Sequence, residues 1–350
     1  MKRFLARLRN TNRVSYISLW ILAVLYTLAL LAGCLSPYPY DLQNRQYALC
    51  PPAIPRIVRD GKITRPFVYG IEAVNPAFKE YSTDTSKTYP VTFFTRGPER
   101  KIFGVFTSGR YFFRAAGQGH IFLFGTDMHG RDVFSRTLHG ARISLSIGII
   151  GVSISFVLGL LIGGISGYFG GKTDAFLMRA VEIIMMFPFF YLMLALRAAF
   201  PPGLSSVQMY FLIVVILSLI GWASLARIIR GMVLSIKEEE YVLAAKSLGL
   251  PTFKIIARHI LPNTFSYTIT ALTLSVPGYI LGESALSLLG LGIQEPHASW
   301  GNMLSVTVGN LRILTTAPWM LIPGFFIFLT VISFNFLGDG IRNVVDPKNW

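Results

Sequence analysis

Residues 239–249 read EEYVLAAKSLG, and residues 258–263 read RHILPN, so that a polar segment lies between two long apolar windows. Nearly every residue from Glu238 to Leu248 tolerates a helix. Gly249 can take the left-handed conformation that ends one, and Pro251 can begin the next. The segment therefore predicts a helix, a turn and a second helix, exposed to water within a chain that is otherwise mostly apolar.

The composition indicates an integral membrane protein. Of the 350 residues, 53% are hydrophobic and only 14% are charged, and the mean hydropathy is +0.54. Soluble domains are less apolar and carry about a quarter charged residues. The net charge of +15 is explained below by membrane topology, so it gives no support to nucleic-acid binding.

Six windows are long and apolar enough to cross a bilayer, which needs about 20 helical residues. The predicted fold class is therefore an all-α integral membrane protein with six transmembrane helices. The third window contains Glu182, one turn from Arg179, and the two can form a local ion pair. The fifth contains Glu283 and the pair Pro277-Gly278, which favours a kink. The windows are 14–35, 143–167, 177–198, 207–226, 264–291 and 316–338.

Basic residues in the short loops set the predicted orientation, because Lys and Arg near the ends of spans are retained in the cytoplasm. They gather in the tail 1–13, after the second and fourth windows, and in the tail 339–350, whereas the opposite short loops hold almost none apart from Arg312. Both termini and the segment 237–262 are therefore predicted to be cytoplasmic. The first window is too long for the core of a secretory signal, so we expect a retained helix. The basic residues concerned are Lys2, Arg3, Arg7, Arg9, Arg13, Lys172, Arg179, Arg227, Arg230, Lys237, Lys246, Lys254, Arg258, Arg342 and Lys348.

Residues 36–142 form an external insert between the first and second windows, with an interfacial helix at its end. Runs such as Phe67-Val68-Tyr69 and 89–94 suggest strands, and turn residues occur at 51–52, 60–61 and 96–98. We therefore expect a lobe of mixed or β character. Cys34 and Cys50 could form a disulfide in an oxidising compartment, or remain two thiols.

The insert ends in FGTDMHGRDVFSR at 124–136. Thr126 or Asp127 can cap an interfacial helix whose Val133, Leu138 and Ile143 face apolar surroundings. The arginines of this stretch, Arg131, Arg136 and Arg142, would then reach lipid headgroups or Asp132. A structural role is favoured over a ligand site.

This string resembles the signature that precedes the second span in permeases of dipeptide, oligopeptide and nickel ABC importers. The resemblance continues to the end of the chain through GYFGG at 167–171, FP at 187–188, RIIRG at 227–231, SWGNM at 299–303 and GDG at 338–340. It implies a type I ABC importer fold in the bacterial inner membrane. The long insert suggests the branch that includes importers of microcin C and other unusual peptides.

The resemblance also gives the opening segment a role, as the coupling loop held in a groove of an ATPase subunit. Ala244, Ala245 and Gly249 have little bulk and allow close approach of a partner. The family's Glu-Ala-Ala triplet is Leu243-Ala244-Ala245 here, so the acid is missing, while Glu240 lies one turn away. The residues expected to couple to the ATPase are Glu240, Tyr241, Ala244, Ala245, Gly249, Leu261 and Pro262. Those expected to line the pathway are Pro277, Gly278 and Glu283, with helix packing as the alternative role of Glu283.

The chain lacks a GxxxxGK[ST] phosphate loop, a nucleophile elbow and any compact His spacing for a metal. We expect a non-catalytic subunit that binds no cofactor, with ATP and Mg²⁺ on partner ATPase subunits. The partners implied are a second permease, two ATPase subunits, an external substrate-binding protein and membrane lipid. The expected cargo is a peptide or peptide-like compound. A nickel or metal-chelate importer is the alternative, followed by a self-contained secondary transporter or channel, and a membrane-embedded enzyme is less favoured.

Overall fold

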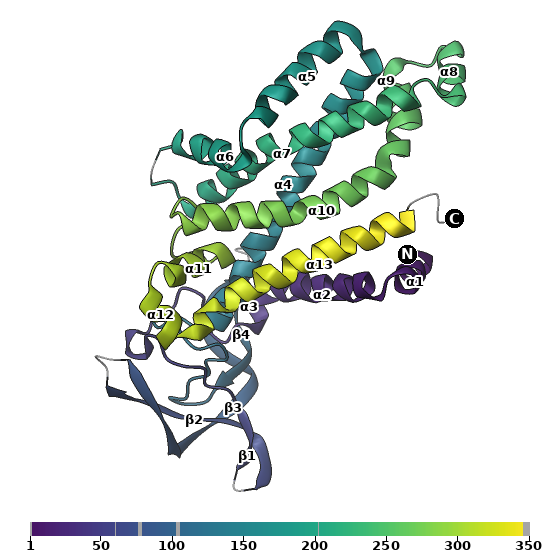
Figure 1. Ribbon diagram of the computed structural model, residues 1–350. Helices are drawn as coiled ribbons and strands as arrows, with labels where there is room; N and C mark the ends of the chain where they lie inside the picture. Colours follow the sequence, from purple (N-terminus) through teal and green to yellow (C-terminus); the bar gives the residue numbers. More distant parts are fainter. Residues whose placement is uncertain (1, 60, 76–78, 103–105, 202, 346–350) are drawn as a thin grey trace. The chain divides into compact units, whose positions relative to one another are not determined.

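The computed structural model describes residues 2–345 apart from 60, 76–78, 103–105 and 202 (Figure 1). The last part of the predicted cytoplasmic tail, including Lys348, lies outside the described residues. The helices before the second window are α1 (Lys2–Thr11), α2 (Arg13–Leu30), α3 (Ala32–Leu35) and the 3₁₀ turn η1 (Arg45–Tyr47). The strands are β1 (Arg56–Arg59), β2 (Lys62–Asn75), β3 (Glu80–Ile102) and β4 (Phe106–Ala115).

The remaining elements are helical. They are α4 (Val133–Phe169), α5 (Gly171–Met186), α6 (Phe189–Ala198), α7 (Ser206–Ile236), α8 (Glu240–Ser247), α9 (Thr252–Ile255), the π-helix η2 (Ile256–Ile260), α10 (Leu261–Leu288), α11 (Trp300–Val308), α12 (Leu311–Thr316), the 3₁₀ turn η3 (Pro318–Leu321) and α13 (Ile322–Val345).

Five helical stretches of the described chain are long and apolar enough to cross a membrane. They cover 13–30, 133–169, 206–236, 252–288 and 318–345. All five overlap predicted windows, so the prediction of a multi-span helical membrane protein is confirmed.

The third window, 177–198, differs from the single span that we expect. Its two halves, α5 and α6, are bent by 91° at a short break. The break falls at Phe187-Pro188, where Phe187 is extended with ψ 132°. Proline disfavours the helical conformation at the residue before it and cannot donate a backbone hydrogen bond, so the helix stops here. The pair counts as a sixth span only when both halves are taken together.

Two further helix boundaries differ from the predicted ones. Helix α4 begins at Val133, so the predicted interfacial helix is the first part of α4 and not a separate element. Helix α13 continues to Val345, into the stretch predicted as a tail after 338. Helix α10 runs unbroken through Pro277.

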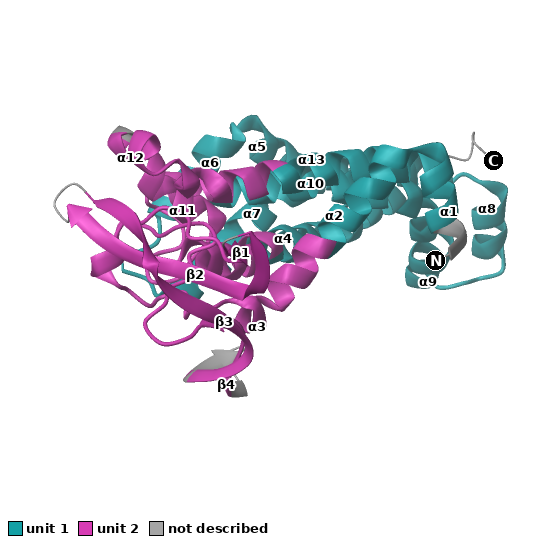
Figure 2. Cartoon of the chain, turned by 90° about the horizontal axis from the view of Figure 1, so that it is seen from below, with its two compact units in different colours: residues 1–23, 146–283, 329–350 teal, residues 24–145, 284–328 magenta. Residues whose placement is uncertain are grey.

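The chain forms two compact units, which Figure 2 distinguishes by colour. Unit 1 comprises residues 1–23, 146–283 and 329–350, and unit 2 comprises residues 24–145 and 284–328. Unit 1 contains most of the long apolar helices. Unit 2 contains the insert and the short helices α11 and α12.

The insert folds as a four-stranded antiparallel sheet in the order β1-β2-β3-β4, which confirms the predicted lobe of β character. Val68, Val91 and Ile121 form its small buried core. Of the turn predicted at 60–61, residue 60 lies outside the described residues, and Gly61, just before β2, has φ +74°. The predicted turn at 96–98 is wrong, because β3 passes through it with a shift of register between Arg96 and Arg100. Cys34 and Cys50 are not joined by a disulfide.

The start of α4 is capped by Asp132 and not by Thr126 or Asp127 as predicted. Its Oδ2 accepts hydrogen bonds from Ser135 N at 2.8 Å and Ser135 Oγ at 2.6 Å. A cap must immediately precede the first helical turn to reach its free N–H groups. Asp127 lies too far upstream and instead accepts from Arg131 Nε at 2.6 Å.

The arginines of the signature also differ from their predicted role at headgroups. Arg131 and Arg136 are almost completely buried, and both pair with Glu295 in the loop before α11. Arg142 donates to the carbonyl oxygens of Ala29 and Leu30 at 2.7 and 2.8 Å. Burial of these guanidinium groups requires fixed acceptors, which Glu295 and the backbone provide.

The SWGNM motif forms the start of α11 within unit 2. Ser299 caps the helix by accepting from Asn302 N at 3.0 Å, and Trp300, fully buried, donates from Nε1 to Thr137 O at 3.0 Å. A Cβ on Gly301 would lie 2.6 Å from Ser284 Cα. The motif is therefore a packing element that joins α11 to α4 and to the end of α10.

In unit 1, α4 and α7 approach closely through glycines spaced one turn apart, Gly159, Gly163 and Gly167. A Cβ on Gly163 would lie 2.5 Å from the carbonyl oxygen of Ala226. Small residues at this spacing let two membrane helices bring their backbones together. At the end of this contact, Arg230 on α7 binds Asp174 on α5, with Nε 2.9 Å from Oδ1.

Candidate functional site

The segment between α7 and α10 lies at one end of unit 1 and forms the predicted helix, turn and second helix. Glu239 is the N-cap residue of α8, with φ −67° and ψ 142°. Gly249 follows α8 with φ +72°, and Pro251 takes the N-cap position of α9. Leu250 N then donates back to Ala245 O at 3.3 Å, which closes the end of α8. We call residues 239–263 the connecting segment.

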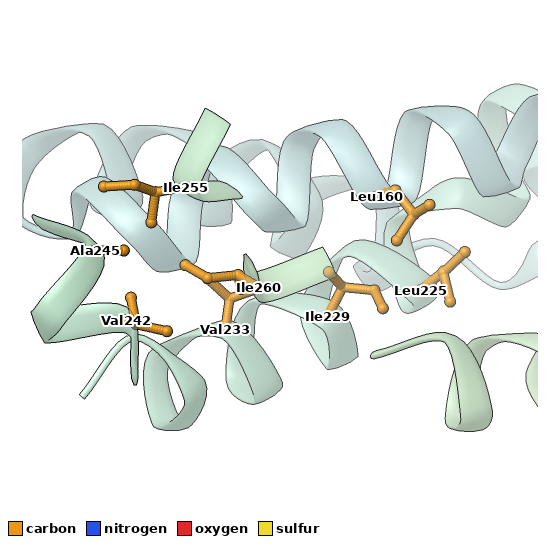
Figure 3. Close-up of a cluster of buried hydrophobic side chains, with 8 residues drawn as sticks. All are labelled: Leu160, Leu225, Ile229, Val233, Val242, Ala245, Ile255 and Ile260. Atoms are coloured by element: carbon orange, nitrogen blue, oxygen red, sulfur yellow. The ribbon is translucent and has the colours of Figure 1, made fainter. Parts of the chain in front are cut away.

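The inner face of the connecting segment is anchored on the apolar helices. Val242 and Ala245 from α8, with Ile255 and Ile260 from the stretch that follows, are at most 4% exposed. Figure 3 shows these side chains directed toward the same cluster. The helices contribute Leu160, Leu225, Ile229 and Val233. Burial of this many apolar side chains fixes α8 and α9 against α4 and α7.

A hydrogen bond adds to this anchor. Tyr241 on α8 accepts from Asn263 Nδ2 on α10 at 2.9 Å, and the same amide donates to His259 O at 2.7 Å. Desolvation and the nearby Glu239 carboxylate raise the pKa of Tyr241 above its ordinary value of 10.0. The hydroxyl therefore stays protonated at neutral pH and serves as a neutral hydrogen-bonding group.

The outer face of the connecting segment exposes large apolar side chains. Leu248 is 81% exposed and Phe253 is 78% exposed, one on each side of the turn at Gly249. Tyr241 and Leu243 are each 44% exposed. The charged residues Glu240 and Lys246 are also exposed. A rigid element with apolar side chains and a charged rim has the composition of a protein-binding surface.

The predicted coupling residues divide between these two faces. Glu240, Ala244, Gly249 and Pro262 are exposed, whereas Ala245 is buried and Leu261 is partly buried. Ala244 is thus exposed and Ala245 buried, although their small size suggested the same role for both. Sequence reasoning missed Leu248 and Phe253, whose positions beside Gly249 and Pro251 are the available signal.

The predicted pathway residues lie further along α10 and are not brought together with the connecting segment. Pro277 and Glu283 are buried, and Gly278 is exposed. Near them, a cavity of about 120 Å³ lies among α4, α7 and α10. Its polar lining includes Ser155, Ser224, Ser275 and Tyr279. The Tyr279 hydroxyl lies 2.5 Å from Ser155 Oγ. Nothing in the sequence indicates this hydroxyl-lined cavity, because isolated Ser and Tyr residues are common in apolar helices.

The predicted pair of Glu182 with Arg179 is present, with Arg179 Nη1 3.1 Å from Glu182 Oε2. Both side chains are mostly exposed, so the pair contributes little to stability. Among the described residues, no group of three His, Cys, Asp or Glu side chains is arranged to hold a metal ion.

Two family models match the sequence. One, the binding-protein-dependent transport system inner membrane component, matches residues 159–350. The other, the N-terminal TM domain of oligopeptide transport permease C, matches residues 1–52. Together they include the connecting segment and the first predicted span, but not the β lobe.

Named relatives are similar over about two thirds of the chain. The dipeptide transport system permease protein DppC of Bacillus subtilis is 47% identical over 226 residues, which is 64% of this chain and 68% of DppC. The oligopeptide transport system permease protein OppC of Haemophilus influenzae is 47% identical over 227 residues, 65% of this chain and 70% of OppC. The OppC protein of Escherichia coli is 42% identical over 232 residues, 66% of this chain and 73% of OppC.

Proposed function

Because the chain belongs to the family of binding-protein-dependent transport system inner membrane components, we propose that it is a permease subunit of an ATP-driven importer of peptides or peptide-like compounds. The names of the relatives, which are dipeptide and oligopeptide permeases, support the choice of cargo. In this proposal the apolar helices form half of the translocation pathway. Both termini and the connecting segment face the cytoplasm, as the distribution of Lys and Arg predicts.

The connecting segment is the proposed docking site for an ATPase subunit. The observation that carries this assignment is the contrast between its two faces. Val242 and Ile260 are buried against the helices, while Leu248 and Phe253 remain almost fully exposed. An element anchored on its inner face can transmit a force applied to its outer face. ATP and Mg²⁺ would be bound by the ATPase subunits, and closure of their dimer would move α7 and α10 through α8.

The exposed residues refine the proposed contact. Leu248 and Phe253 would fill apolar pockets of the ATPase, and Glu240 and Lys246 would pair with charged groups at its rim. Ala245 belongs to the anchor and not to the docking face. Leu243, where the family has an acid, is half-exposed and would add apolar contact.

The remaining partners follow from the proposed function. A second homologous permease would complete the pathway, and an external substrate-binding protein would deliver the peptide. The chain would contribute no catalytic residue to ATP hydrolysis. Membrane lipid would surround the exposed apolar faces of the helices.

Co-purification with the ATPase subunits tests the docking site. We expect Leu248→Arg to reduce the amount of ATPase retained by the permease, because a charge replaces an apolar anchor. Ile63→Arg is the matched control, since Ile63 on β2 is 86% exposed and lies outside the connecting segment. Equal retention of ATPase by both variants would count against the docking site.

A further inference from the structure

A second candidate site lies within unit 2, at a cavity of about 550 Å³. Three parts of the chain converge on it: the segment after α3, strand β3 of the insert, and the first turns of α4. The loop before α11 completes the wall. The side chains that matter are Tyr40, Asp41, Glu99, His139, Arg142 and His297.

Three aromatic side chains that line this cavity lie next to one another. The Tyr40 ring lies 4.9 Å from the ring of His139 and 6.0 Å from that of His297, with tilts of 35° and 44°. Ring faces attract cations through their negative π-electron density.

His297 also presents an unused polar atom. Its Nδ1 is buried and has no hydrogen-bond partner among the described residues. With the proton on Nε2, this nitrogen is an acceptor. A buried acceptor without a donor is unfavourable, so a bound donor group would stabilise it.

The charges of the cavity favour a cation over an anion. Asp41 and Glu99 are exposed carboxylates, and no described residue forms an ion pair with either. Arg142 is the basic residue of the lining, but its Nε and Nη2 already bind the carbonyl oxygens of Ala29 and Leu30. A metal ion is not favoured, because in the described part of the chain no three His, Cys, Asp or Glu side chains are grouped to ligate one.

We propose that this cavity binds an ammonium group of the transported peptide, a proposal that rests on the function proposed above. The ammonium would donate to the Asp41 and Glu99 carboxylates and to His297 Nδ1, with its charge near the Tyr40 and His139 rings. The cavity is large enough for the residues next to that ammonium. Because Glu99 comes from β3, the insert would take part in choosing the substrate.

The test measures peptide binding to the full-length chain in lipid nanodiscs by isothermal titration calorimetry. The probes are tri-alanine, N-acetyl-tri-alanine and N-acetyl-Ala-Lys-Ala, which separate a terminal ammonium from a side-chain ammonium. Two variants are compared with the wild type. One is the double variant Asp41→Asn/Glu99→Gln, and the other is His297→Phe, which keeps a ring but removes the acceptor. Glu80→Gln is the matched control, because Glu80 is an exposed carboxylate on the same strand as Glu99.

We expect saturable binding of tri-alanine, weakened about tenfold or more by acetylation, as for the loss of a hydrogen bond to a charged group. The Asp41→Asn/Glu99→Gln variant should bind tri-alanine more weakly by the same factor. His297→Phe should weaken binding by a smaller factor, and Glu80→Gln should leave it unchanged. Recovery of binding with N-acetyl-Ala-Lys-Ala would identify a basic side chain as an acceptable source of the ammonium.

Any of three results would overturn the proposal: no saturable binding at millimolar peptide, equal binding of the free and acetylated peptides, or a double variant that still distinguishes free from acetylated peptide as the wild type does. Failure here is distinguishable from failure of the proposed function. The separating experiment measures ATP-dependent peptide uptake by an importer that contains the Asp41→Asn/Glu99→Gln permease. If this importer still prefers peptides with a free amine, the ammonium site is rejected and the importer assignment stands.

Discussion

Asn263 donates a hydrogen bond from Nδ2 to the hydroxyl oxygen of Tyr241 at 2.9 Å. The two residues lie on different helices, α10 and α8, so the bond ties α8 to the first turn of a long apolar helix. Together with the buried Val242 and Ala245, it explains how a short surface helix is held firmly enough to transmit movement.

The first prediction concerns this bond. Tyr241→Phe removes the hydroxyl and keeps the ring, and should cost roughly 0.5–1.5 kcal/mol of local stability. Amide hydrogen exchange in α8 should then be faster by about two- to tenfold, because local opening becomes easier. Tyr267→Phe is the control, since Tyr267 on α10 has the same 44% exposure. Equal exchange in the two variants would show that the bond does not hold α8.

The second prediction separates backbone strain from docking at Gly249. This residue has φ +72°, and no described atom lies within 4 Å of the position that a Cβ would take, so any replacement is strained but meets no clash. Gly249→Ala and Gly249→Arg should therefore lose similar stability, roughly 1–2 kcal/mol. Only the arginine also adds bulk and charge to the outer face.

Uptake measurements on both variants make the distinction. Gly249→Arg should insert normally and leave binding on the external side intact, yet reduce ATP-dependent uptake well below that of Gly249→Ala. Normal uptake by the arginine variant would contradict the docking assignment.

The third prediction concerns the contact between α4 and α7. Gly163→Ala places a methyl group 2.5 Å from the Ala226 carbonyl, a backbone atom that cannot rotate away. We expect a loss of about 1–3 kcal/mol, as for other overpacked sites, seen as a lower melting temperature in detergent.

Gly231→Ala on α7 is the control, because no described atom lies within 4 Å of the added Cβ. It should be neutral, or stabilising by up to about 1 kcal/mol from helix propensity. If both variants melted alike, the close approach of the two helices would be wrong.

The fourth prediction is a pH dependence from Asp132. Burial, with a smaller contribution from the negative charge of Asp127, raises the pKa of Asp132 from 3.8 to about 7, against the lowering effect of its hydrogen bonds from Ser135. Its Oδ1 is buried without a hydrogen-bond partner among the described residues. The folded protein thus binds a proton between pH 4 and about 7 that the unfolded chain releases.

Stability should therefore fall as the pH rises through this interval and level off above about 7, because the folded state must then hold a buried carboxylate. Asp132→Asn should flatten the dependence of the melting temperature on pH. A wild-type melting temperature that rises from pH 5 to pH 7 would refute this assignment.

Features set by neighbouring residues were predictable from the sequence. Five of the six apolar windows correctly predicted a long helix, because hydropathy determines which segments enter a bilayer. The turn at Gly249 and the ion pair of Arg179 with Glu182 were also predictable, since both depend on spacing within one or two helical turns. The break at Pro188 carried a local signal, a proline inside a helical window, that a hydropathy average conceals.

Features that depend on distant residues were not predictable. Nothing near Arg131 and Arg136 indicates that Glu295 is their partner, because the three meet only after folding. The different exposure of Ala244 and Ala245 depends on which face of α8 meets Val233 and Ile260. The cavity around Tyr40 and His297 is assembled from four separate stretches, and single-residue patterns do not reveal such assemblies.

The importer assignment is tested most directly by peptide uptake into proteoliposomes that contain this chain with its second permease, its ATPase subunits and its substrate-binding protein. We expect accumulation of labelled tripeptide that requires both ATP and the binding protein and that falls sharply with Leu248→Arg. Accumulation by the chain alone, driven by a proton gradient without ATP, would contradict the assignment.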